Sequence, residues 1–330
     1  MKWLQNHEVA INLALFKRYQ FYHIFNPNGS KLFNYDTYKL TNIMFIMAVI
    51  TYNIFSAMCF FTDTIDTINS IDLLLMIFIY FIDVISLLKI SVLLFDADQI
   101  WELFDLTRLD FLTSKRCRNN VGILCKYRDK SITITNFYQN YSTAVRISVI
   151  ITFPTCCIRV SANFYNNYYY LFYLMEIAMG IFVVNYSIII DNFLISLCWA
   201  IIAQYEAITT AFESIGKDWE LTNLHNEKEF YSFEAHKDLK SIIMDQNKIY
   251  ITLKSFYYVV WIIVLCSIII VSVLLVIMTY SFITMCSLSA ESFSIFNIFK
   301  ISTVFFVFVI QLYLYCYLFD VLNDKGPDKT

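Results

Sequence analysis

Six charged residues interrupt the long apolar runs of this chain, and their types and positions could carry chemistry. A charged side chain at the centre of a bilayer costs at least ~2.5 to 3.5 kcal/mol, so it usually faces the interior of a helical bundle or a wet cavity. Such a side chain then pairs with another or contacts a ligand. The six residues are Asp83, Lys89, Arg146, Glu176, Asp191 and Lys300.

Asp83 and Arg146 are predicted to form an interhelical ion pair. Both lie at matching depth, ~18 Å and ~17 Å below the outer ends of their runs at 1.5 Å per helical residue. Lys89 is six residues from Asp83, which puts the two side chains ~120° apart on one helix and disfavours a direct pair. The alternative is that Arg146 lines a water-filled pocket alone.

The other charges are assigned by depth. Asp191 lies deep towards the inner end of its run, where a structural bridge to the fifth run or to the C-terminal tail is favoured over ligand binding. Glu176 and Lys300 lie closer to the outer surface, which their side chains can reach by extending towards the lipid headgroups.

Catalysis finds little support in the sequence. The histidines, His7, His23, His225 and His236, have no metal-binding spacing, and no nucleophile elbow or phosphate loop occurs. Nine cysteines form no C-x-x-C pair, and only Cys157 with Cys286 is a candidate disulfide. We therefore expect no enzymatic activity, no metal and no cofactor.

The composition is that of a membrane protein. Hydrophobic residues make up 58% of the chain and charged residues 15%, against about 25% charged in soluble domains. The net charge of -3 gives no reason to expect a nucleic-acid partner. So much apolar surface must be covered by lipid.

Apolar runs long enough to cross a bilayer predict an all-α polytopic helical bundle with six transmembrane helices. The predicted organisation is a cytoplasmic amphipathic segment at 1–39, the bundle at 40–319 with long cytoplasmic loops at 96–131 and 203–255, and a cytoplasmic tail at 320–330. The runs are 40–61, 71–95, 132–157, 171–202, 256–282 and 295–319.

Basic residues fix the orientation. Of the 24 lysines and arginines, 20 fall on one side of this topology and Arg159 alone on the other. Since basic loops stay in the cytoplasm, both the N-terminus and the tail are predicted to be cytoplasmic. This orientation is opposite to that of a G-protein-coupled receptor, and the paired helix breaks typical of a transporter are lacking.

Aromatic side chains are the second signal for a ligand site. Tyr80 and Phe81 in the second run, with Phe296 and Phe299 in the sixth, are expected in the outer half of the bundle. An apolar cavity with a few polar groups would suit a small volatile ligand. Ordinary helix packing is the alternative for each of these side chains.

Three stretches resemble the insect odorant receptor family. The run QLYLYCYLFDVLNDK (311–325) is similar to the end of that family's sixth span, DNFLISLCWAIIAQYEAI (191–208) to the end of the fourth, and EAHKDLKSIIMDQNKIY (234–250) to the helix that leads into the fifth. The resemblance extends over essentially the whole chain in order and hydropathy. A gustatory receptor of the same architecture is the nearest alternative.

The resemblance implies a ligand-tuning subunit of an odorant-gated, non-selective cation channel in the plasma membrane. Its partners would be a small volatile odorant and a co-receptor subunit, in a hetero-oligomer that is expected to be a tetramer. The family continues into a pore-lining seventh span, so we expect this chain to be truncated before it. The odorant would bind between spans two, three, four and six, near Tyr80, Phe81, Arg146, Ile151, Glu176, Phe296 and Phe299.

Overall fold

The computed structural model describes residues 31–32, 35–63, 70–106, 111–152, 162–225, 228–287 and 295–324. Nearly all of them are helical. A two-residue antiparallel strand pair, β1 (Lys31–Leu32) and β2 (Tyr35–Asp36), precedes the helices. The helices are α4 (Thr37–Asp63), α5 (Ser70–Phe95), α6 (Ala97–Asp105), α7 (Lys115–Arg118), α8 (Val121–Thr152), α9 (Ala162–His225), α10 (Lys228–Ser287) and α11 (Ile295–Asp324).

The described residues of each of the six predicted apolar runs lie in a different long helix, which confirms the all-α prediction for the described part of the chain. The helices extend beyond the predicted runs mainly at one end of the bundle. Helix α8 begins at Val121, well before the predicted start at 132, and the predicted loop 96–131 contains α6 and α7. Most of the N-terminal amphipathic segment and most of the tail lie outside the described residues, so the predicted domain boundaries stay a prediction.

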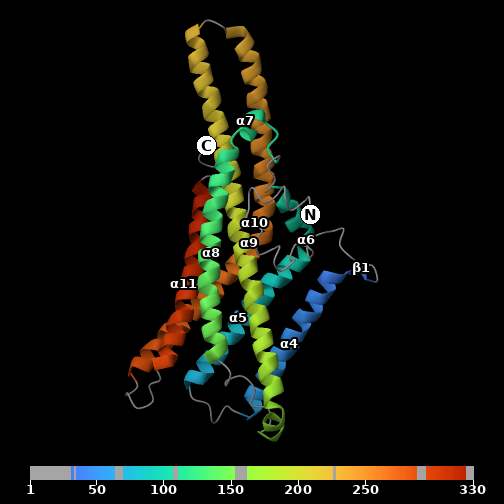
Figure 1. Ribbon diagram of the computed structural model, residues 1–330, viewed down its shortest axis with the longest axis vertical. Coiled ribbons are helices and arrows are strands. Elements are labelled where there is room, and N and C mark those ends of the chain that lie inside the picture. Colours follow the sequence, from blue (N-terminus) through green and yellow to red (C-terminus); the bar gives the residue numbers. More distant parts are fainter. Residues whose placement is uncertain are drawn as a thin grey trace.

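The bundle is organised around α9 (Figure 1). Helices α9 and α10 run antiparallel and project together beyond the other helices at one end, whereas α4 lies at the side of the bundle. Helix α9 contacts α5, α8, α10 and α11. A helix that is apolar on all sides belongs in a core, and the sequence of α9 has this character in its middle.

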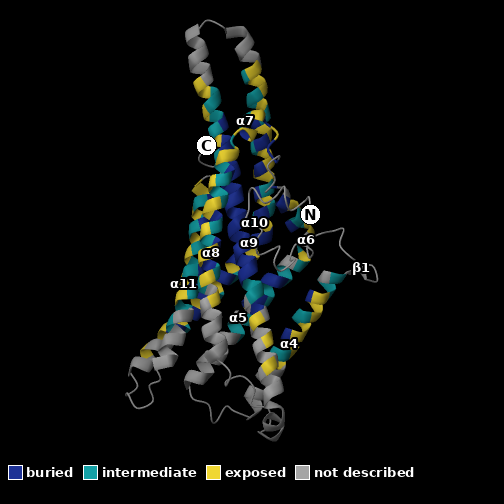
Figure 2. Ribbon diagram, viewed as in Figure 1, coloured by how far each residue is buried: buried dark blue, intermediate teal, exposed yellow. Residues whose placement is uncertain are grey.

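Every residue of α9 from 188 to 205 is buried, as Figure 2 shows by its continuous dark blue. Burial continues on one face as far as Ala211, where the aliphatic side chains pack against α10 and the segment around α6 and α7. The first part of the predicted cytoplasmic loop 203–255 is therefore helical and partly buried as far as Ala211. The reason is that α10 is itself a long helix that covers α9 on this side.

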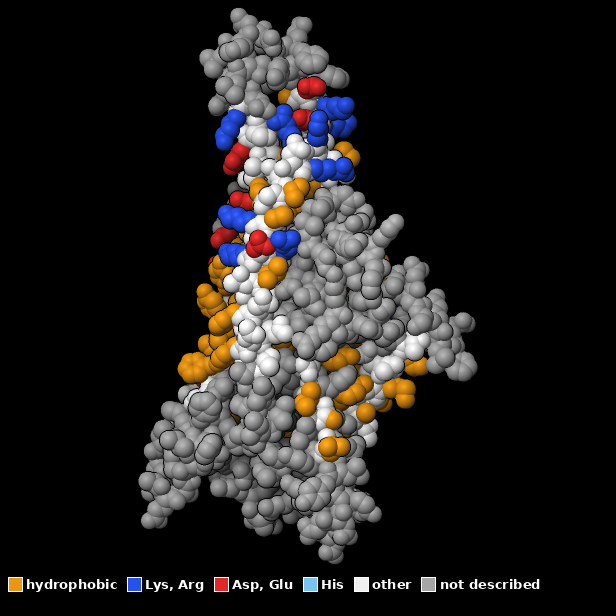
Figure 3. All heavy atoms as spheres, viewed as in Figure 1, with side chains coloured by type: hydrophobic (Ala, Val, Ile, Leu, Met, Phe, Trp, Pro, Cys, Tyr) orange, Lys and Arg blue, Asp and Glu red, His pale blue; other side chains and the backbone are white. Residues whose placement is uncertain are grey.

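Three stretches among the described side chains are long and apolar enough to cross a bilayer: Asn185–Lys217, Glu234–Tyr280 and Phe305–Asp324. The stretches on α10 and α11 leave large side chains exposed, including Ile269 and Val276 on α10 and Phe306 on α11. Figure 3 shows charged side chains gathered over one part of the molecule, above a part where hydrophobic side chains predominate. This division is that of a helical membrane protein.

Candidate functional site

The predicted ligand site is only partly visible in the structure. Phe81 of α5 packs against a small apolar cluster that includes Leu274 of α10 and Phe308 of α11, and Tyr80 is half-buried beside it. These contacts are also what ordinary helix packing requires. The side chains of Arg146, Ile151, Glu176, Phe296 and Phe299 lie outside the described residues, so the ligand site stays a prediction.

Asp83 lies against α4, where its carboxylate interacts with the Asn53 side chain. Asn53 also donates a hydrogen bond to the Val49 carbonyl oxygen, 3.0 Å away. An amide is a suitable neutral partner for a half-buried carboxylate. The predicted pair with Arg146 stays a prediction, because the Arg146 side chain is not described.

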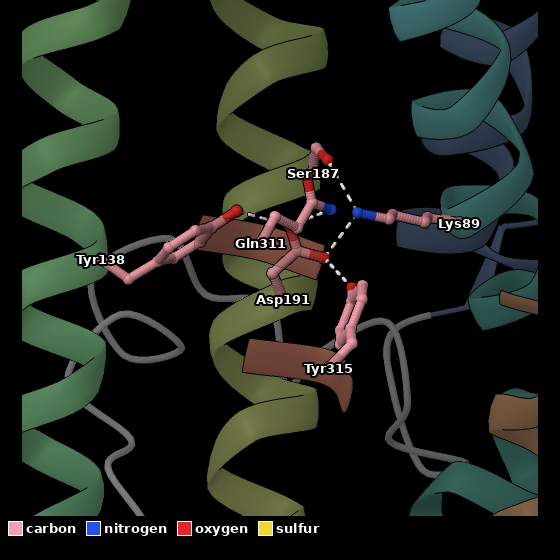
Figure 4. Close-up of polar contacts among 6 residues, drawn as sticks. All are labelled: Lys89, Tyr138, Ser187, Asp191, Gln311 and Tyr315. Carbon is pink, nitrogen blue, oxygen red and sulfur yellow. Dashed lines mark hydrogen bonds and ion pairs between the residues drawn. The ribbon is translucent and has the colours of Figure 1, made fainter. Parts of the chain in front are cut away.

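The best-defined polar site is centred on Asp191 of α9 and joins four helices (Figure 4). We call it the Asp191 cluster. The Lys89 ammonium of α5 lies 2.5 Å from Oδ1 of Asp191 and 3.3 Å from the Ser187 hydroxyl. Tyr138 of α8 donates a hydrogen bond to Oδ2 at 2.9 Å. Gln311 and Tyr315 of α11 donate to Oδ2 at 3.2 Å and to Oδ1 at 2.5 Å.

The Asp191 cluster is closed to solvent. The side chain of Lys89 is 0% exposed and that of Asp191 3% exposed. Each carboxylate oxygen accepts two hydrogen bonds, which uses about all of the acceptor capacity of the group. The Lys89 ammonium also lies 5.9 Å from the centre of the Tyr315 ring, within reach of a cation–π interaction.

This arrangement suits a structural link better than catalysis. A general base must have an acceptor site available to take a proton from a substrate, and the Asp191 carboxylate already accepts four hydrogen bonds. A buried ion pair of this kind is destabilising to break, because the remaining charge is left without compensation. The cluster therefore fixes α5, α8 and α11 against α9 at one level.

Sequence reasoning predicted a bridging role for Asp191 but named the wrong partners, the fifth run or the tail. The partners lie in the second, third and sixth runs. Depth could have identified Lys89: at 1.5 Å per residue it lies ~27 Å from the outer end of its run, and Asp191 lies ~30 Å from the outer end of its own. Nothing in the pattern of tyrosines singled out Tyr138 or Tyr315.

A second polar site fixes the segment 111–118 to α10, and sequence reasoning missed it. The buried Asp245 carboxylate accepts from the backbone N–H groups of Thr113 and Ser114, both at 2.8 Å, and from the Thr113 hydroxyl at 2.7 Å. Lys248, one turn later, donates to the Phe111 carbonyl oxygen at 2.7 Å and lies over its ring. The segment is therefore held to α10 through its backbone.

The segment 111–118 also carries a partly exposed ion pair and a buried thiol. Arg116 contacts Asp238 of α10 at 2.6 Å and donates to the Ser214 hydroxyl of α9 at 3.2 Å. The Ser114 side chain caps α7 by accepting from the Cys117 N–H at 3.1 Å. Burial raises the pKa of the Cys117 thiol above its usual value, and the Asp245 charge adds to this effect.

Metal chemistry has no visible basis in the described side chains. They contain no group of three or more histidine, cysteine or carboxylate side chains close enough to hold a metal ion. His236 is exposed on α10, and the side chains of the other histidines are not described.

Comparison with known proteins agrees with this architecture. The sequence profile of the 7tm Odorant receptor family matches residues 69–318. The fold is similar to that of the insect olfactory receptor OR5 from Machilis hrabei, with a TM-score of 0.66 and 11% sequence identity over 96% of this chain and 82% of that one. No curated protein sequence matches the chain. The matched profile covers most of the sequence and includes every residue of the Asp191 cluster, so the chain belongs to the 7tm odorant receptor family.

Proposed function

We propose that this chain is the ligand-tuning subunit of an odorant-gated, non-selective cation channel that it forms with a co-receptor subunit. The observation that carries the proposal is the family match over residues 69–318. The likeness of the whole bundle to an insect olfactory receptor supports it further. The role proposed is that of a receptor and not of an enzyme.

The proposed odorant site lies between α5, α8, α9 and α11, in the half of the bundle away from the charged surface. Phe81 supports this position, since it packs with Leu274 and Phe308 in an apolar cluster that is separate from the main core. The Asp191 cluster joins the same four helices deeper in the bundle. A ligand that displaces α11 in the proposed site would therefore move a helix that the Asp191 cluster holds against α5, α8 and α9.

The proposed orientation puts the N-terminus in the cytoplasm of a plasma-membrane protein. The strong asymmetry of lysine and arginine between the two sides supports it. An epitope tag at the N-terminus should bind antibody only after the cells are permeabilised. Binding to intact cells would contradict the orientation.

The experiment that tests the proposed function is co-expression with an insect odorant co-receptor in oocytes. We expect a panel of volatile odorants to evoke a cation current that requires both chains and is absent when the co-receptor is expressed alone. Surface labelling of a tagged chain is the control for delivery to the membrane. A chain that reaches the surface with the co-receptor but responds to no odorant would count against the proposal.

A further inference from the structure

Asn192 of α9 is buried next to Asp191 but has no hydrogen-bond partner in the described structure. Its side chain is 4% exposed, and neither the amide nitrogen nor the amide oxygen contacts a partner. Its neighbour in sequence, Asp191, accepts four hydrogen bonds. The contrast is sharp, because an amide can donate two hydrogen bonds and accept two.

A buried amide without partners is unfavourable, and more so where the surroundings are hydrocarbon. Native proteins almost always pair such groups, either with protein atoms or with ordered water. The Asn192 amide therefore calls for a partner beyond the described side chains.

Two buried serines lie close to the level of Asn192 in the bundle. Ser131 of α8 donates to the Ser196 hydroxyl of α9 at 3.3 Å, and Ser196 lies one helical turn from Asn192. Tyr138 lies two helical turns after Ser131 on α8 and contacts Asp191, so the two contacts agree on how α8 is aligned with α9. Helices α8 and α9 run antiparallel (Figure 1). Because residue 192 falls between residues 191 and 196 on α9, it lies at a level between these two contacts with α8.

We propose that the α8–α9 interface holds ordered water that bridges Asn192 to the hydroxyls of Ser131 and Ser196. Water is small, and it can both donate to the amide oxygen and accept from the amide nitrogen. The serine hydroxyls have more hydrogen-bonding capacity than their mutual contact uses. A cation is a poor alternative, because the adjacent Asp191 carboxylate is neutralised by Lys89 and its acceptor positions are filled.

The proposal predicts the direction in which the substitution Asn192→Leu changes the stability of the protein. Leucine has nearly the shape of asparagine. If water bridges the amide, Asn192→Leu breaks the bridge, and we expect the ratio of folded to unfolded protein to fall about fivefold. If the amide has no partner at all, the same substitution removes an unfavourable group and leaves stability unchanged or higher, which would overturn the proposal. The control is Asn136→Leu, at an exposed position of α8.

A second measurement detects the water itself and works on the unmodified protein. Radiolysis of bound water oxidises adjacent side chains, so Tyr138, only 2% exposed, should be oxidised although bulk solvent does not reach it. Phe256 of α10, 0% exposed, is the buried reference and should react much less. In Asn192→Leu the oxidation of Tyr138 should fall while that of Phe256 stays constant. Equal protection of Tyr138 and Phe256 in the unmodified protein would contradict the proposal.

Discussion

The substitution Asp191→Asn should destabilise the bundle by about 3–5 kcal/mol, because it leaves the Lys89 ammonium buried without a counter-charge. The amide also has one acceptor oxygen in place of two, so some of the donors from Tyr138, Gln311 and Tyr315 lose their partner. A loss of this size corresponds to a fall in Tm on the order of 10 °C.

The assay is thermal unfolding of the detergent-solubilised, fluorescently tagged protein, followed by size-exclusion chromatography. The variants are Asp191→Asn, Lys89→Met and the double variant. Removing both charges together leaves no uncompensated charge, so the double variant should be more stable than Asp191→Asn alone. A double variant that loses the sum of the two single effects would refute the reasoning, because independent sites are additive.

Three further predictions concern single side chains. Tyr315→Phe removes one hydrogen bond to the Asp191 carboxylate and should cost about 1.5–3 kcal/mol in thermal unfolding, whereas Tyr313→Phe, at a side chain 64% exposed, should leave the stability unchanged. Asp245→Ala removes three hydrogen bonds from the segment 111–114 and should make that segment sensitive to limited proteolysis; a digestion pattern like that of the unmodified chain would contradict the role assigned to Asp245. Because burial raises the pKa of Cys117, its thiolate fraction at pH 8 is lowered, and it should react with iodoacetamide more slowly than the partly exposed Cys125, which also lies in the predicted cytoplasmic loop 96–131, as mass spectrometry of the alkylated peptides can measure.

The fold class was predictable because hydropathy alone selects helices in a membrane. Each apolar run is long enough to span a bilayer, and a spanning segment must satisfy its backbone groups internally. Helix ends were less predictable. The apolar pattern of α9 stops near residue 202 in the sequence, but burial continues to Ala211 because α10 covers this face, and no periodicity within α9 reports the length of its neighbour.

The polar contacts were predictable only where two charged residues lie at the same depth in their apolar runs. Matching depths could relate Lys89 to Asp191, whereas depth among charged residues did not point to Asn53, the uncharged neighbour of Asp83 on α4. The pair of Asp83 with Arg146 stays a prediction. Depth fixes one coordinate, and which faces of two helices meet depends on packing across the whole bundle. The contact of Asp245 with the backbone of Thr113 and Ser114 carries no sequence signal, since a backbone N–H is the same at every residue.

The most direct test of the proposed function compares two phenylalanines on α5. Phe81 packs in the apolar cluster proposed to border the odorant site, and Phe95 is 88% exposed on the same helix. With the co-receptor present and surface expression matched, Phe81→Ala should raise the odorant concentration for half-maximal current about tenfold, because truncating this partly buried ring removes about 1.4 kcal/mol or more of apolar contact, and 1.4 kcal/mol is tenfold in affinity. Phe95→Ala should leave that concentration unchanged. Equal odorant sensitivity of the two variants would contradict an odorant site at this position.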